Sequence, residues 1–87
     1  MSIITTFDYG NKKYAVGEEA FHVLDSNGHE LESYPYQQTT GAGGVSSQGE
    51  YFDSSILSNT GEMIIKLPDT DEAKEFYLAY LKQRNKF

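Results

Sequence analysis

The sequence contains no cysteine, no tryptophan, only two prolines and no long apolar run in its 87 residues. The absence of cysteine excludes a disulfide framework, a thiolate nucleophile and cysteine-based zinc or iron–sulfur sites. No apolar stretch approaches the ~20 residues that a transmembrane helix needs. The start, Met1-Ser2-Ile3-Ile4, lacks the basic segment and long apolar run of a secretory signal. We therefore expect a complete, single-domain cytoplasmic protein over residues 1–87, without membrane association.

Basic side chains are missing from the centre of the chain. The sequence has 13 acidic and 7 basic residues and a formal net charge of -6, yet no Lys or Arg lies between Tyr14 and Ile65. This stretch carries its acids at Glu18, Glu19, Asp25, Glu30, Glu32, Glu50, Asp53 and Glu62. Because nucleic acid binding needs clustered cations, we expect no direct contact with nucleic acid. Two interpretations stay open: a surface that maintains solubility, or one that docks on a basic protein.

Three turn signals divide the first part of the chain into strands. Gly10-Asn11, Asn27-Gly28 and Asn59-Thr60-Gly61 each separate runs that contain apolar and β-branched residues. Glycine and asparagine accept the positive φ that tight hairpins require. The spacing predicts an antiparallel sheet or bent barrel of about five to seven short strands.

The last element is predicted to be an amphipathic helix over residues 70–84. Asp69 is the expected N-cap, and Glu72 completes a pattern like a capping box. One helical stripe contains Ala73, Phe76, Tyr77, Tyr80 and Leu81. This stripe should cover the apolar face of the sheet, so the fold class is α+β.

Residues 37–49 are rich in Gly, Ser and Gln and have few apolar side chains. We predict a flexible loop there, because little apolar burial would offset the entropy of ordering it, although a short strand could still occupy Tyr36–Thr40. The run Gly41–Ser46 begins like a dinucleotide-binding loop but has Ser46 where the third glycine belongs, and no obvious helix follows. We therefore expect no bound cofactor.

The order of these elements resembles small bacterial pleckstrin-homology-like domains. The similarity covers most of residues 12–85 and rests on Lys13–Val23, Asn27-Gly28, Tyr34–Gly41, Ile56–Ile65 and the helix. It implies a bent barrel of seven strands capped by one C-terminal helix, and a binding module without catalysis. Relatives that bind phosphoinositides use a basic first hairpin. Lys12 and Lys13 occupy that position here, and we interpret them as solvated turn residues.

Catalytic and metal-binding patterns are not found, so the sequence predicts no enzyme and no metal site. If Asn27-Gly28 is a two-residue turn, His22 faces Ser33 and His29 faces Ser26, so the imidazoles are not cross-strand neighbours. No nucleophile-elbow pattern surrounds the serines of the Gly-rich segment. Glu30 and Glu32 would share one strand face, ~7 Å apart, as on many solvated sheets.

Aromatic and acidic residues gather on both sides of the Gly-rich segment. They form either core or a contact surface, and as a surface the candidate residues are Glu30, Glu32, Tyr34, Tyr36, Glu50, Tyr51 and Asp53. The first hypothesis is a non-catalytic interaction module for a protein partner, with self-association left open. The second is an acidic inhibitor of the type that phages and mobile elements encode. It would occupy the basic nucleic-acid-binding cleft of a host enzyme. The third is a small-ligand binder with the segment as a lid.

Overall fold

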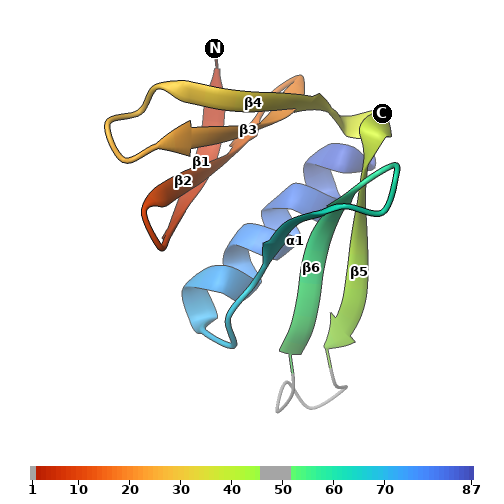
Figure 1. Cartoon of the computed structure of the whole chain (residues 1–87). Coiled ribbons are helices and arrows are strands. Elements are labelled where there is room, and N and C mark those ends of the chain that lie inside the picture. Colours follow the sequence, from red (N-terminus) through yellow and green to blue (C-terminus); the bar gives the residue numbers. More distant parts are fainter. Residues whose placement is uncertain (1, 46–51) are drawn as a thin grey trace.

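The chain forms two antiparallel sheets and one C-terminal helix in the computed structural model, which describes residues 2–45 and 52–87 (Figure 1). The first sheet contains β1 (Ile3–Tyr9), β2 (Lys12–Gly17), β3 (Ala20–Asp25) and β4 (Glu30–Pro35), in that spatial order. A short 3-10 helix, η1 (Tyr36–Gln38), leads to a second sheet of β5 (Thr39–Val45), β6 (Phe52–Ser58) and β7 (Met63–Lys66), followed by α1 (Asp71–Arg84). The predicted α+β class is confirmed, and the sheets do not close into a barrel.

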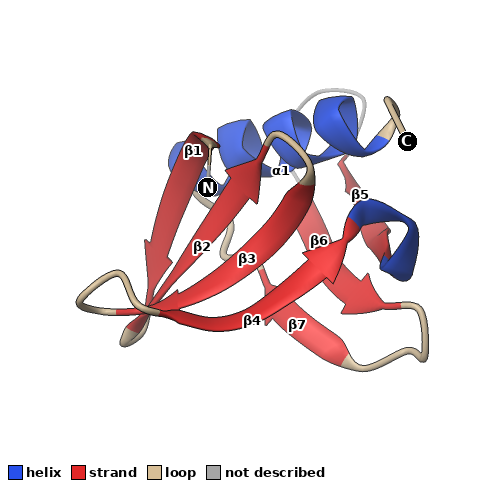
Figure 2. Ribbon diagram, turned by 90° about the horizontal axis from the view of Figure 1, so that it is seen from above, coloured by secondary structure: helices blue, strands red, loops and turns tan. Residues whose placement is uncertain are grey.

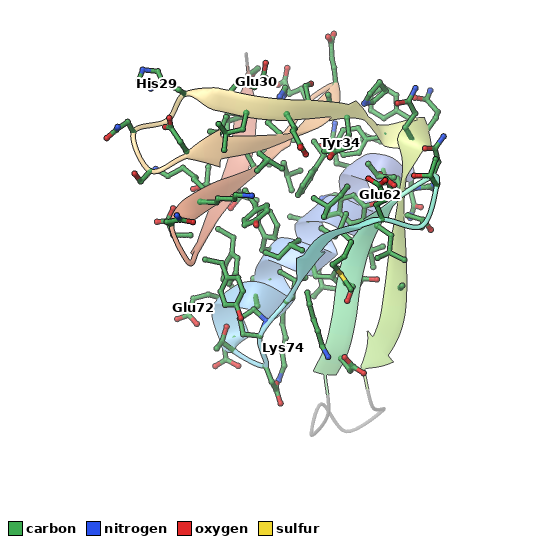
Figure 3. All side chains as sticks on the ribbon, viewed as in Figure 1. His29, Glu30, Tyr34, Glu62, Glu72 and Lys74 are labelled. Atoms are coloured by element: carbon green, nitrogen blue, oxygen red, sulfur yellow. The ribbon has the colours of Figure 1, made fainter. Side chains whose placement is uncertain are left out.

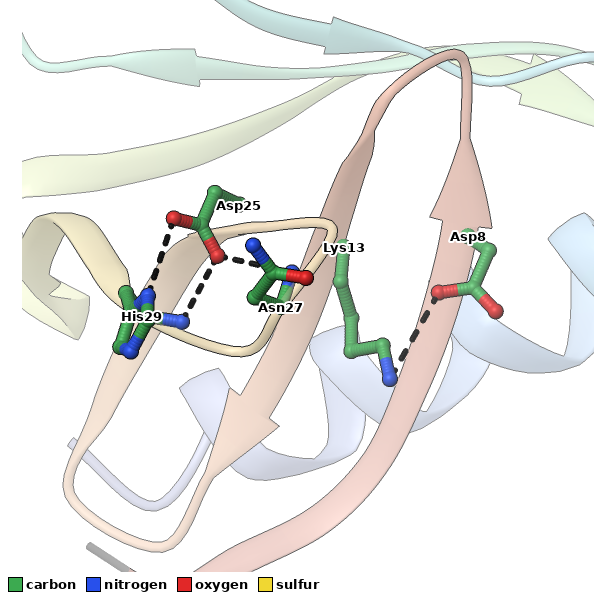
Figure 4. Close-up of polar contacts among 5 residues, drawn as sticks. All are labelled: Asp8, Lys13, Asp25, Asn27 and His29. Carbon is green, nitrogen blue, oxygen red and sulfur yellow. Dashed lines mark hydrogen bonds and ion pairs between the residues drawn. The ribbon is translucent and has the colours of Figure 1, made fainter.

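The predicted turns lie where expected, and Gly10, Gly28 and Gly61 have positive φ. Residues 26–28 form the β3–β4 loop, because the Asp25 N–H donates to the His29 carbonyl at 2.8 Å. The Asp25 carboxylate accepts from the N–H groups of Asn27 and His29, both at 2.9 Å (Figure 4). The His29 N–H bond is the main cause that lowers the pKa of Asp25. The turn is therefore longer than the predicted two residues, and His29 lies opposite Asp25, not Ser26.

The β6–β7 turn repeats this construction. The Ser58 hydroxyl accepts from the N–H groups of Thr60 and Glu62, at 3.3 and 3.2 Å. In both turns a short polar side chain accepts from the residues two and four positions later, and a glycine takes the third loop position. This local chemistry explains why both turns could be predicted.

The aromatic stripe of α1 is buried, as predicted, but it packs between two sheets and does not cover the face of a single one. Phe76 lies with its ring centre 5.5 Å from that of Phe7 and 6.1 Å from that of Phe21. Tyr80 is fully buried and meets Phe21 edge-on at 5.7 Å. The buried apolar core is Tyr14, Val16, Phe21, Val23, Tyr36, Ile56, Ile65, Leu67, Ala73, Phe76, Tyr77 and Tyr80.

The two ends of α1 are fixed by polar contacts. Thr70, not the predicted Asp69, is the N-cap and accepts from the Ala73 N–H at 3.2 Å. Asp69 instead forms an ion pair with Lys74 at 3.3 Å. At the other end, the Gln83 amide donates to the Glu18 carbonyl at 2.6 Å, and Arg84 donates to the Thr39 carbonyl at 2.8 Å. The helix end is therefore bonded to the β2–β3 turn and to β5.

The structure of the Gly-rich segment differs from the predicted flexible loop. Residues 36–38 are helical and Thr39–Val45 form strand β5, whereas a flexible loop was predicted over 37–49. Residues 46–49 lie outside the described part of the chain. A Cβ on Gly41 would lie 2.5 Å from the Tyr77 hydroxyl, so glycine lets β5 approach α1 closely. Packing against the helix therefore stabilises a strand that local composition disfavours.

Candidate functional site

The predicted contact surface divides into separate places. Glu50 and Tyr51 lie outside the described residues. Asp53 lies at the start of β6 and pairs with Lys66 of β7, with 3.8 Å between the charged groups. The remaining candidates come from β4 and η1, and the structure assigns them three different environments.

Tyr36 belongs to the core, so its prediction as a contact residue is wrong. Its side chain is 0% exposed, and its hydroxyl donates to the Gly17 carbonyl at 2.5 Å. The ring stacks on Phe87 at 5.3 Å and packs against Tyr80. Burial raises the pKa of Tyr36 to about 12, because the ionised phenolate would be poorly solvated there. The core interpretation is therefore the correct one for this ring.

Glu30 and Glu32 do not share a face, contrary to the prediction. Leu24 is paired with Glu30 and Val23 with Glu32, so Leu31 is an extra residue in the ladder. Such a β-bulge changes the alternation of side chains along the strand. Glu30 bonds to the His22 ring at 2.6 Å, whereas Glu32 lies opposite the buried Val23. The bulge therefore turns Glu32 toward the space between the sheets.

Glu32, Tyr34 and Glu62 form what we call the Tyr34 cluster. The Tyr34 hydroxyl donates to Glu32, and Figure 3 shows Tyr34 on the same side of β4 as Glu62. The hydrogen bond to Glu32 is the main cause that raises the pKa of Tyr34 to about 12, and the charge of Glu62 contributes. Within the described residues, no Lys or Arg forms an ion pair with either glutamate. The cluster therefore presents uncompensated negative charge.

A groove of about 500 Å³ runs along β7, and we call it the β7 groove. Tyr9 and Tyr14 of the β1–β2 hairpin form one wall, and residues 63–67 form the other. Tyr9 is 47% exposed and Met63 is 56% exposed, so large apolar groups face solvent there. Figure 2 shows β4 and β7 crossing on the side of the molecule away from α1.

The groove and the cluster are neighbours. Burial is the main cause that raises the pKa of Tyr14, and the charge of Glu32 and the Tyr9 hydroxyl add to it. Tyr14 and Glu32 both lie beside Val23, on the inner face of the first sheet. A ligand in the β7 groove would therefore reach the Tyr34 cluster without leaving the surface.

Sequence reasoning missed most of the groove residues. Tyr9 and Met63 both line the groove, although they are far apart in the sequence. Glu62 was recognised only as one acid among eight in the stretch without cations. The usable signal was the alternation of Tyr14 and Val16 in β2, which places both on the inner face.

The histidines lie apart, as predicted, with His22 opposite Ser33. His29 faces Asp25 at 3.3 Å. Across residues 2–45 and 52–87, no three side chains of the His, Asp or Glu type are placed to hold a metal ion.

Removing the Glu32 carboxylate should change the titration of Tyr34. In the wild type, Tyr34 should ionise near pH 12, because ionisation breaks its bond to Glu32 and opposes two carboxylates. In a Glu32→Gln variant the pKa should fall toward 10.0, the ordinary value. NMR titration of the Tyr34 ring signals would measure this. An unchanged pKa in the variant would show that burial, not Glu32, controls it.

Comparison of the chain with protein-family models, with curated proteins and with solved structures finds no match. Among the residues that the structure describes, no helix is long and apolar enough to cross a membrane.

Proposed function

We propose that this protein is a non-catalytic interaction module that binds a basic protein partner. The contact surface would be the Tyr34 cluster together with the β7 groove. The proposal rests on two carboxylates beside exposed apolar groups: Glu32 accepts from the Tyr34 hydroxyl, and Glu62 lies on the same side of β4. Clustered carboxylates attract a cationic partner, and aromatic groups beside them supply apolar contact area. The weak resemblance to pleckstrin-homology-like domains also implies a binding module.

The acidic-inhibitor hypothesis has less support. It derives from the absence of Lys and Arg between Tyr14 and Ile65. Yet Glu30 is bonded to His22, and Asp25 caps its own turn and faces His29. Two acids of this stretch are therefore directed at groups beside them on β3 and its turn, and they do not form an exposed row of carboxylates like the phosphates of a nucleic acid. We therefore place this hypothesis second.

Reversing the charge of the cluster should abolish partner binding. We expect Glu32→Lys with Glu62→Lys to reduce retention of the partner at least ~10-fold, because like charges then face each other. The matched control is Glu72→Lys with Glu75→Lys, the same charge change on exposed positions of α1. The measurement is affinity capture from host lysate at low and moderate salt, with mass spectrometry of the retained proteins.

Salt should weaken the retained complex, because ions screen exposed charges beyond about 8–10 Å. Circular dichroism must show that both double variants keep the wild-type fold. Equal retention by the wild type and the cluster variant would contradict the proposal. A retained basic nuclease or polymerase whose nucleic acid competes for binding would favour the acidic inhibitor.

A further inference from the structure

Strand β7 has a free edge. It is the outer strand of the second sheet and, in the described part of the chain, pairs only with β6. The Leu67 N–H donates to the Ser54 carbonyl at 3.0 Å, so Leu67 faces β6. Successive residues of a strand direct their N–H and C=O groups to opposite sides. The main-chain groups of Lys66 therefore point away from β6.

Met63 has the same orientation at the other end of the strand. The Glu62 carbonyl accepts from the Ser58 N–H at 2.8 Å, so Glu62 faces β6 and Met63 faces away. A bulge lies between, because Ile56 pairs with Ile65 and Leu57 pairs with Met63. The main chain of β7 therefore offers outward groups at Met63 and at Lys66.

The bulge preserves a regular spacing at this edge. Met63 lies opposite Leu57, and Lys66 lies opposite Ser55. Leu57 and Ser55 are two residues apart on β6. The distance along the edge between the outward groups of Met63 and Lys66 is therefore that between residues i and i+2 of a strand without a bulge. A regular extended chain can therefore bond to both.

The surroundings of the edge define what such a chain would contain. The β7 groove would take its apolar side chains against Tyr9 and Tyr14. The acids beside the far end, Asp53 and Asp69, are paired with Lys66 and Lys74. Among the described residues, no Lys or Arg forms an ion pair with Glu32 or Glu62, so a cation of the ligand can pair with them. Pro68 has no N–H, so the edge ends there, after about 13 Å.

We propose that the partner binds as an added β-strand on the free edge of β7. This inference rests on the proposed function and specifies its ligand. The occupant is an extended segment of a partner protein, with about four residues paired to β7. An aromatic or aliphatic side chain enters the β7 groove, and a Lys or Arg reaches Glu32 and Glu62. A second copy of this chain fits less well, because each copy carries a charge of -6.

The test uses linear peptides of about ten residues, selected from a random library against the immobilised wild-type chain. We expect selected sequences that alternate apolar with other residues and contain Lys or Arg. NMR should show the largest amide shifts at Met63 and Lys66. A single N-methyl group on a peptide N–H that faces β7 should weaken binding ~10-fold. An N-methyl group on the next residue, whose N–H faces away from β7, should not weaken binding.

The outcomes separate this inference from the proposed function. If binding is lost in Glu32→Lys with Glu62→Lys but tolerates every N-methyl group, the added strand is wrong and the acidic contact surface stands. If neither change weakens binding, both are wrong. A selection without binders overturns the added strand. Sedimentation could instead show that the wild-type chain is a dimer, with NMR amide shifts at Met63 and Lys66 on dimerisation. The edge of β7 would then bind a second copy of the chain, and the proposed partner strand would be wrong as well.

Discussion

Replacing Gly43 with alanine should strongly destabilise the protein. A Cβ at this position would lie 1.7 Å from the main-chain oxygen of Asp53, and the φ of Gly43 is +91°. The oxygen belongs to the backbone of the paired strand, so it cannot move away like a flexible side chain. Positive φ adds about 1–2 kcal/mol for a residue with a Cβ. We expect a loss of at least ~3 kcal/mol from a domain that has about 5–15 kcal/mol.

The neighbouring glycine provides the matched control. Within residues 2–45 and 52–87, no atom lies within 4 Å of the Cβ position of Gly44, and its φ is not positive. Gly44→Ala should therefore change the free energy of unfolding by less than ~0.5 kcal/mol. Urea denaturation followed by circular dichroism measures both variants. Equal stability of Gly43→Ala and the wild type would mean that β5 does not pair with β6 in this register.

Truncating Tyr36 should have a comparable effect. Tyr36→Ala removes a fully buried ring that packs against Tyr80 and Phe87, and it leaves the Gly17 carbonyl without its donor. Losses of about 3–5 kcal/mol are usual for a buried aromatic ring. Tyr36→Phe keeps the ring and should lose only about 1 kcal/mol. Thermal and urea unfolding at neutral pH compare the two.

The pH dependence gives a second measure of the same contact. The folded-state pKa of Tyr36, about 12, lies above its ordinary value of 10.0. Its contribution to stability is therefore complete below pH 10 and is lost as the pH rises toward 12. Tyr36→Phe should lack this part of the alkaline loss. A folded, stable Tyr36→Ala variant that merely fails to bind a partner would contradict the assignment of the ring to the core.

Local chemistry in the sequence was enough to predict the turns, the helix and the fold class. Gly28 and Gly61 supply the positive φ of their hairpins, and Asp25 and Ser58 cap them within four residues. The helix stripe follows from a period that is visible in the sequence alone. These features depend on interactions between near neighbours, so no knowledge of the remaining chain was needed.

The candidate site depended on tertiary structure. One bulge residue, Leu31, separates Glu30 from Glu32, and composition does not mark it. Gly41 lies in a strand because Tyr77, far along the chain, fills the space above it. Whether Tyr36 was core or surface could not be predicted, since tyrosine suits both environments.

The acidic charge, the turn positions, the helix and the α+β class follow from the order of residues alone. That Tyr14 and Ile64 line one groove, and that Glu62 lies on the same side of β4 as Tyr34, is visible only in the folded chain. Ladder register and sheet-to-sheet packing are long-range properties. They depend on which apolar faces can be buried together, and a one-residue bulge is enough to redirect a side chain from one face to the other.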